Sequence, residues 1–254
     1  MHWAERRTSL GEGVGLVGAI DAGQLFVAYQ PVIDLAGRRL QRFEALVRWR
    51  HPRRGVLYPV DFLPPPSSAG LARRLTYFVI NDAARACQSW RGAAPWVGVS
   101  VNVWPADLAD AGIVALCEER ASDIDLTLEV IEEGSEADWL EQPAPAGVCL
   151  SLDDFGMGES SLLRLRSKSV TELKLDRLFA ERLVTSPRDR SIVAAIVGLA
   201  HDLDMTVVVE GIEDADTARI CTDIGVDFGQ GWAFGRPAAN PGPALASWSH
   251  PQPA

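Results

Sequence analysis

Residues 172–210 read ELKLDRLFAERLVTSPRDRSIVAAIVGLAHDLDMTVVVE and contain one full repeat of the pattern that decides the fold. The stretch begins with a short apolar run, Glu172–Leu175, and closes on another, Met205–Val209. Between them, from Ile192 to Leu203, apolar residues recur at three- and four-residue steps, as on one face of an amphipathic helix. The stretch therefore predicts two buried strands joined by a helix, which is the unit of a parallel sheet.

The same alternation extends over most of the chain, with a second helical pattern from Leu71 to Cys87. The eight short apolar runs are Leu25–Ile33, Leu40–Trp49, Trp96–Val103, Ile124–Ile131, Gly147–Leu152, Glu172–Leu175, Met205–Val209 and Ile224–Phe228. Only Asp34 to Arg39 joins the first two runs, which is too short for a helix, so these strands should pair antiparallel. We predict an α/β fold, a (β/α)8 TIM-like barrel with one antiparallel strand near the N-terminus. An open doubly wound sheet is the alternative, but the chain lacks a G-x-G-x-x-G or Walker loop.

The length of 254 residues suits a single barrel domain. We expect an N-terminal extension over residues 1–20, the barrel over residues 21–240 and a disordered, proline-rich tail over residues 241–254. No run of 18 apolar residues is present, which predicts no membrane span. The four cysteines form no C-x-x-C pair, which favours free thiols in the cytoplasm. The formal net charge of −10 argues against direct binding of a DNA or RNA duplex.

Polar residues, most of them acidic, lie within or close behind seven of the apolar runs. In chain order they are Glu44, Asn102, Glu129, Glu132, Asp153, Asp154, Lys174, Asp176, Glu210, Glu213 and Gln230. Apart from the first interval, the first polar residues of successive runs are separated by about the length of one strand–helix unit. Because the carboxyl ends of barrel strands meet at one mouth, these side chains should converge there.

A group of carboxylates at one mouth implies bound cations, because several neighbouring carboxylates cannot all stay ionised without them. Oxygen ligands favour Mg²⁺ or Mn²⁺, and the four histidines are too scattered for a zinc site. Two such cations in one carboxylate cluster are the arrangement used for in-line displacement at phosphorus. Lys174 would then hold the attacking water and help to deprotonate it. The pattern predicts a phosphodiester hydrolase.

Each of these residues also has a purely structural explanation when it is taken alone. A single acidic residue after a strand is more often a helix cap than a metal ligand. Asp153 and Asp154 fit a turn, and Lys174 fits a salt bridge with a neighbouring acid. The joint pattern, rather than any one residue, favours a functional site.

From about Leu25 to Pro237 the chain resembles the EAL-domain phosphodiesterases of bacterial cyclic di-GMP signalling. The matching motifs are Tyr29-Gln30-Pro31, the segment from Glu44 to Pro52, Ser100-Val101-Asn102, Leu128 to Glu132, Asp153 to Gly158, Leu173 to Asp176, Val209 to Glu213 and Gln230 to Pro237. The resemblance implies an EAL-type barrel that hydrolyses cyclic di-GMP to the linear dinucleotide pGpG. It also implies a water activated by two Mg²⁺ or Mn²⁺ ions, and a homodimer.

The resemblance implies a role for each matching residue. The first metal ion would be held by Glu44, Asn102, Glu129 and Asp153. The second would be held by Asp153, Asp154 and Glu210. Lys174 and Gln230 would act with Glu44 in catalysis by positioning the attacking water. Gln30 and Arg48 would contact the nucleotide, and Glu132 would stabilise the loop after the two aspartates.

The sequence departs from the family pattern beside this site. Met157 stands where a small polar residue is usual, Glu159 where an aromatic residue is usual, and Trp104 where a serine is usual. The stretches 102–129 and 132–153 are short, which predicts truncated helices. A catalytically weak or inactive module that binds cyclic di-GMP or a protein partner is the alternative, and a barrel enzyme with another substrate is a further one. With no GGDEF or sensor domain before the barrel, regulation is expected to come from partners, substrate supply or metal, or to be absent.

Overall fold

The computed structural model describes residues 13–63, 69–130, 142–156 and 161–248. Its strands are β1 (Leu25–Asp34), β2 (Arg39–His51), β3 (Gly55–Leu57), β4 (Gly98–Val103), β5 (Leu126–Val130), β6 (Val148–Phe155), β7 (Val170–Leu175), β8 (Thr206–Val209) and β9 (Phe228–Gln230). Its helices are α1 (Gly13–Asp21), α2 (Pro59–Phe62), α3 (Ala69–Trp90), the 3-10 helix η2 (Pro105–Ala109), α4 (Ala111–Ala121), α5 (Ser161–Arg164), α6 (Arg177–Ala180), α7 (Pro187–Asp202), α8 (Ala215–Ile224) and α9 (Gly242–Trp248).

The strands close into a barrel in the order β1-β9-β8-β7-β6-β5-β4-β2, because β1 also pairs with β2. From β2 through β4 to β9 all neighbours in this ring run parallel. Strand β1 runs antiparallel to both of its neighbours, β2 and β9. The predicted barrel with one antiparallel strand near the N-terminus is therefore confirmed.

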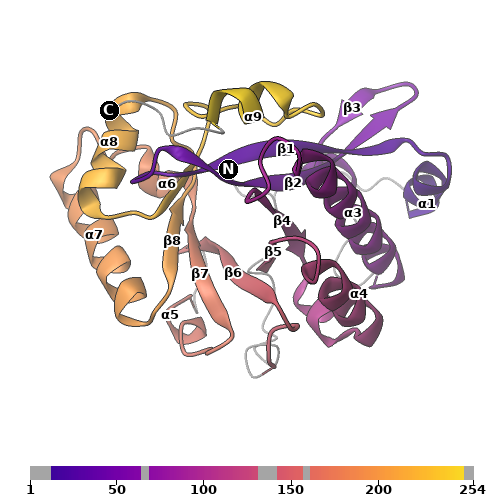
Figure 1. Ribbon diagram of the computed structural model, residues 1–254, viewed down its shortest axis with the longest axis horizontal. Helices are drawn as coiled ribbons and strands as arrows, with labels where there is room; N and C mark the ends of the chain where they lie inside the picture. The colour runs from indigo at the N-terminus through magenta and orange to yellow at the C-terminus, as the bar shows by residue number, and fades with distance from the viewer. Residues whose placement is uncertain (1–12, 64–68, 131–141, 157–160, 249–254) are drawn as a thin grey trace.

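Helices cover the outside of the barrel (Figure 1). Figure 1 shows α3 and α4 on one side, α7 and α8 on the opposite side, and α9 beside β1 and β2. The two helices expected from their periodicity are present, and each buries part of the predicted apolar stripe, although Ile192 and Leu199 of α7 are exposed. On α3 this stripe contains Leu75, Val79 and Ala83, and on α7 it contains Val193 and Val197. None of the described helices is long and apolar enough to cross a membrane.

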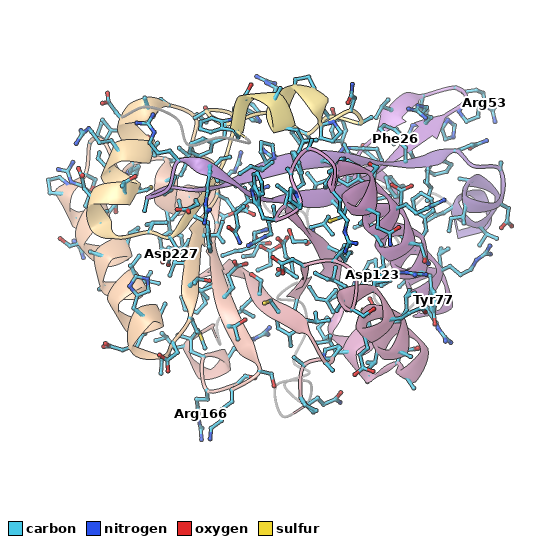
Figure 2. The ribbon with its side chains drawn as sticks, viewed as in Figure 1. Phe26, Arg53, Tyr77, Asp123, Arg166 and Asp227 are labelled. Carbon is cyan, nitrogen blue, oxygen red and sulfur yellow. The ribbon has the colours of Figure 1, made fainter. Side chains whose placement is uncertain are left out.

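The last apolar run was assigned to the wrong element, because Ile224–Phe228 is not a strand. Ile224 ends the amphipathic helix α8, and Gly225 caps that helix in the left-handed region at a φ of 94°. Strand β9 begins only at Phe228. Asp227, labelled in Figure 2, fixes the turn, because its carboxylate accepts a hydrogen bond from the Val207 amide at 2.8 Å. The three-residue strand β3 was not predicted.

The C-terminal segment is helical where disorder was expected. Helix α9 occupies residues 242–248, so the prediction of a disordered tail is wrong for these residues. Trp248 stacks edge-on against Phe234 with ring centroids 5.7 Å apart, and its indole N–H donates to the Phe234 carbonyl oxygen at 3.0 Å. At the other end of the chain, α1 packs on the core through Leu16 and Ala19.

The helical layer is thin between β4 and β5. Helix α4 has 11 residues, half the length of α3, and η2 precedes it. Between β5 and β6, residues 142–147 contain no helix, and residues 131–141 lie outside the described part of the chain.

The inside of the barrel carries two levels of polar side chains. Successive residues of a strand point to opposite faces, so Arg42 and Glu44 share one face of β2, and Glu172 and Lys174 share one face of β7. At the deeper level Arg42 and Glu172 form a buried ion pair of 2.6 Å. Glu44 and Lys174 lie one step nearer the carboxyl ends of their strands. The alternation therefore delivers polar groups to the mouth, where barrel sites are built.

Candidate active site

Lys174 is the centre of the predicted cluster. Its side chain is 1% exposed, and its ammonium group lies 2.8 Å from Glu129, 3.1 Å from Asp153, 2.6 Å from Glu210 and 3.9 Å from Glu44. Burial alone lowers the pKa of Lys174, but these four carboxylates outweigh burial and raise the pKa well above its usual range. Lys174 is therefore a fixed positive charge among four acidic side chains that come from β2, β5, β6 and the end of β8.

Glu44 lies at the mouth between two amide side chains. Asn102 donates a hydrogen bond to Glu44 Oε1 at 2.8 Å, and Gln230 donates to Glu44 Oε2. Burial raises the pKa of Glu44, but Lys174 and these two hydrogen bonds outweigh it and lower the pKa. Glu44 is thus held as an anion, with its two oxygen atoms oriented by the ends of β4 and β9.

The paired aspartates of β6 face different parts of the site. Regular alternation would send Asp153 and Asp154 to opposite faces of the strand. The pairing of β6 with β7 is irregular between Leu152 and Phe155, and Asp154 has a φ of 53°. This bend lets Asp153 contact Lys174 while Asp154 stays at the same mouth.

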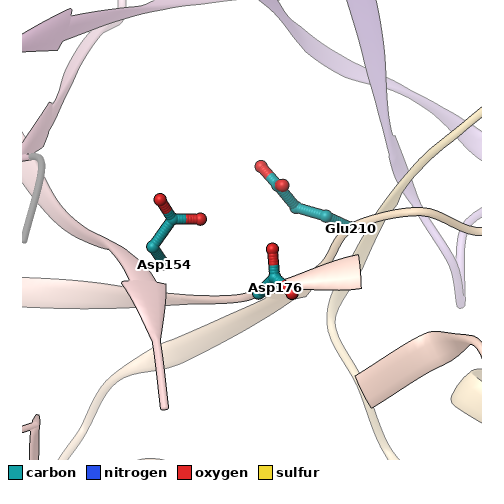
Figure 3. A group of neighbouring side chains, drawn as sticks. All are labelled: Asp154, Asp176 and Glu210. Carbon is teal, nitrogen blue, oxygen red and sulfur yellow. The ribbon is translucent and has the colours of Figure 1, made fainter. Parts of the chain in front are cut away.

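Asp154, Asp176 and Glu210 form a compact oxygen cluster. One carboxylate oxygen from each lies within 4.8 Å of the others, and Figure 3 shows the three side chains pointing toward one another. Asp176 follows β7 and also caps α6 by accepting a hydrogen bond from the Leu178 amide. Sequence reasoning noted Asp176 but did not assign it to the site. Its cap position alone gave no reason to prefer a metal ligand.

The site holds more negative charge than Lys174 neutralises. Burial and the neighbouring Asp153 raise the pKa of Asp154 to about 6. Burial and Asp153 also raise the pKa of Glu210 to about 8, although Lys174 opposes this change. Burial and Glu44 raise the pKa of Glu129 well above its usual range. Groups with raised pKa values at one mouth favour either bound protons or bound cations.

A pocket of about 470 Å³ opens over this cluster. Among the predicted site residues, its lining contains Gln30, Glu44, Asn102, Asp153, Glu210 and Gln230. Lys174 and Glu129 lie beneath the pocket, in contact with its lining carboxylates. The pocket wall also contains Trp104, Arg177, Glu213 and Trp232. The sequence had indicated Glu213 near this mouth and Trp104 beside it, without a role for either. Arg177 and Trp232 were missed, because they reach the pocket from segments whose course no periodicity predicts.

Gln30 and Arg48 occupy different positions relative to the pocket. Gln30 accepts a hydrogen bond from Gln230 at 3.2 Å and donates one to the Gly235 carbonyl oxygen, so it joins the pocket floor. Arg48 is on the same face of β2 as Glu44, and its guanidinium lies 4.9 Å from the ring centroid of Tyr58. Arg48 is 7% exposed and, unlike Gln30, is not among the residues that line the pocket.

Three further residues of interest cannot be located. Glu132, which was expected to stabilise the loop after β6, lies outside the described residues. Met157 and Glu159 of that loop lie outside them as well. Their predicted roles stay predictions.

Known proteins are similar to this chain in sequence and in fold. The bifunctional diguanylate cyclase/cyclic di-GMP phosphodiesterase MucR of Pseudomonas aeruginosa is 36% identical over 232 residues, which are 86% of this chain and 34% of MucR. The cyclic di-GMP phosphodiesterase PdeR of Escherichia coli K12 is 33% identical over 241 residues, which are 91% of this chain and 36% of PdeR. The chain thus spans about a third of the length of these relatives.

A solved structure described as the PaMucR phosphodiesterase in complex with c-di-GMP superposes with a TM-score of 0.79. The two chains are 34% identical, and the match covers 90% of this chain and 98% of the other. The family described as EAL domain matches residues 15–237. This range includes every described residue of the candidate site. The chain belongs to the EAL domain family.

Proposed function

We propose that this chain hydrolyses cyclic di-GMP to the linear dinucleotide pGpG with the help of two Mg²⁺ or Mn²⁺ ions. One observation carries the proposal: Glu44, Glu129, Asp153 and Glu210 surround Lys174 at the floor of a pocket large enough for a small ligand. The phosphodiesterase names of MucR and PdeR support the substrate. The c-di-GMP complex of the structurally similar PaMucR domain supports it further.

The donor atoms at this mouth suit hard divalent cations. They are carboxylate and amide oxygens, which Mg²⁺ and Mn²⁺ prefer. Among the described residues, the buried oxygens Glu129 Oε1 and Gln230 Oε1 have no hydrogen-bond partner, which is costly unless something else binds them. We propose that one ion is held by Glu44, Asn102, Glu129 and Asp153. The second is held by Asp153, Asp154 and Glu210, with Asp176 as a further ligand supported by its place in the oxygen cluster.

The chemistry is the addition of water to one phosphodiester of the ring. Two bound cations would lower the pKa of a water molecule and stabilise the charge on the leaving oxygen. Lys174 and Gln230 orient the attacking water through their N–H groups. The water oxygen forms a bond to phosphorus, the bond from phosphorus to the ribose 3′ oxygen breaks, and that oxygen takes up a proton. The product has a 5′ phosphate and a free 3′ hydroxyl.

The direct test is incubation of the protein with cyclic di-GMP and Mg²⁺ or Mn²⁺, with the linear product measured by chromatography. We expect turnover with either metal and none after chelation. Binding of cyclic di-GMP without product under every metal condition would replace this proposal with that of a silent binding module. If the protein neither bound nor hydrolysed cyclic di-GMP, this nucleotide would be excluded as its ligand.

Replacement of Glu44 tests the ligand assignment. Glu44→Gln keeps the shape of the side chain but removes a negative charge, so we expect product formation to fall about 100-fold or more, beyond the usual effect of residues that only support a ligand. The matched control is Glu119→Gln, which removes an exposed carboxylate from α4 and should retain full activity. A folded Glu44→Gln protein with near-normal activity would exclude Glu44 as a ligand.

A further inference from the structure

The geometry points to Trp104 as a residue that determines substrate specificity by stacking on one purine base of the bound nucleotide. This inference rests on the proposed function and adds a contact for the base, whereas the carboxylate cluster recognises only the phosphodiester. Trp104 lines the pocket and is partly buried against the core. No other role described above uses it.

The course of the chain carries the Trp104 side chain to the pocket mouth. Trp104 directly follows β4 and keeps an extended conformation, with φ −83° and ψ 152°. It is therefore on the same face as Asn102, one strand repeat of about 7 Å further toward the mouth. The indole thus lies above the carboxylate floor, at the height where the base of a nucleotide with its phosphate on that floor would extend.

The backbone of Trp104 is anchored rather than free. Its amide donates to the Asp107 carboxylate at 3.0 Å, and the same oxygen accepts a hydrogen bond from the Thr76 hydroxyl at 2.8 Å. Asp107 is 5% exposed, and Thr76 belongs to α3, so Trp104 is tied to the wall of the barrel. A backbone held in place before binding loses little entropy on contact with a ligand.

The surroundings of Trp104 suit a flat heterocycle. Leu63 together with Leu75 and Val79 of α3 contributes apolar surface to the same pocket. Across the described residues, no aromatic ring or guanidinium group stacks on the Trp104 indole. Trp232 is a weaker candidate, because the guanidinium of Arg236 already lies 3.9 Å from its ring centroid. Trp104 therefore offers a rigid aromatic face next to apolar groups, which is the usual platform for a base.

The test compares Trp104→Leu with Trp104→Phe. Leucine keeps apolar bulk without a ring, and phenylalanine keeps a ring. For cyclic di-GMP we expect Trp104→Leu to raise KM by about fivefold or more, the effect of one lost base stack, with kcat within about twofold. Trp104→Phe should restore most of the KM. The matched control is Trp96→Leu, an exposed tryptophan before the opposite end of β4, which should change neither parameter.

A second substrate separates base stacking from a structural role. The ratio of the KM for cyclic di-UMP to the KM for cyclic di-GMP should be smaller in Trp104→Leu than in the parent, because a purine loses more stacking area than a pyrimidine. An unchanged KM or an unchanged preference would overturn the inference while leaving the hydrolase in place. If the parent binds but does not turn over, dissociation constants measured by calorimetry carry the same comparison. If the parent neither binds nor hydrolyses cyclic di-GMP, both the proposed function and the inference fail.

Discussion

At the scale of the residue, Lys174 explains how four buried or partly buried carboxylates coexist. Its ammonium contacts Glu129, Asp153 and Glu210 at 3.1 Å or less. One positive charge does not balance these acids. The uncompensated negative charge, together with burial, raises the pKa values of Glu129 and Glu210. The arrangement is therefore poised to take up cations, and Lys174 limits the repulsion while they are absent.

The first prediction replaces this ammonium. Lys174→Met should lower turnover about 100-fold or more, since a group that orients the attacking water is lost. In chelator it should also destabilise the fold by about 3–5 kcal/mol, because several buried carboxylates lose their partner. Saturating Mn²⁺ should then raise the midpoint of thermal unfolding more in the variant than in the parent.

Lys168→Met is the control for Lys174→Met, because Lys168 is exposed. It should leave turnover and the thermal midpoint unchanged. Equal metal-induced shifts in Lys174→Met and the parent would show that Lys174 does not share its carboxylates with the metal site.

At the scale of the element, the alternation of side chains along the strands positions the site, and a deeper ion pair links two strands that are not neighbours in the barrel. Arg42 of β2 and Glu172 of β7 meet across the barrel interior at 2.6 Å, each about 5% exposed. Arg42 also lies over the Phe228 ring of β9, 5.7 Å from its centroid. Each residue lies two positions before a site residue, so the pair supports the floor on which Glu44 and Lys174 are placed.

The second prediction concerns this ion pair. Arg42→Met leaves Glu172 as an unpaired buried acid and should cost about 3–5 kcal/mol in the free energy of unfolding. Arg42→Met combined with Glu172→Met removes both charges and should cost less than the single change. Urea unfolding of the single and double variants measures the difference. A double variant as unstable as the sum of its parts would mean that the two charges do not stabilise each other.

Strands and helices were predictable from sequence to different degrees. Periodicity identified β7 and α7, because a buried strand and a half-buried helix have distinct repeats. It misplaced the last strand, because Ile224 is apolar as part of helix α8 and only residues 225–227, beginning with the left-handed Gly225, separate the two elements. It missed α9, because contacts of Trp248 with Phe234 stabilise that helix rather than its own pattern.

The site shows the same division. Glu44 and Lys174 were predictable because they lie in strands, where alternation sets the direction of the side chain. Asp176 joins the oxygen cluster, and Arg177 and Trp232 line the pocket. All three lie in segments after strands, where the path of the chain depends on tertiary contacts. Asp154 was assigned correctly to this mouth, but only the φ of 53° explains how two successive aspartates both reach it.

At the scale of the whole molecule, the charge of the site couples folding to pH and to metal. Burial and Asp153 raise the pKa of Glu210 to about 8 in the folded protein, against a usual value of 4.5. An acid whose pKa is raised on folding binds its proton more tightly in the folded state. Its contribution to stability is therefore present at low pH and is lost as the pH rises from about 4.5 through about 8. Asp154, with a pKa of about 6, acts in the same direction over a narrower range.

The last prediction follows from this loss of stability with rising pH. In chelator, raising the pH from about 5 to about 8 should lower the thermal midpoint of the parent more than that of Glu210→Gln, whose side chain stays neutral. The gap should reach several degrees, since about 1 kcal/mol moves the midpoint of a chain this size by roughly 2–4 °C. Saturating Mg²⁺ or Mn²⁺ competes with protons for the same oxygens, so its stabilising effect should grow with pH in the parent. Parallel pH curves for parent and variant would mean that Glu210 titrates normally, and a metal effect independent of pH would place the ions elsewhere. If the pH curves of parent and variant diverge in chelator and converge when metal is added, the excess negative charge at the barrel mouth is what binds the cations.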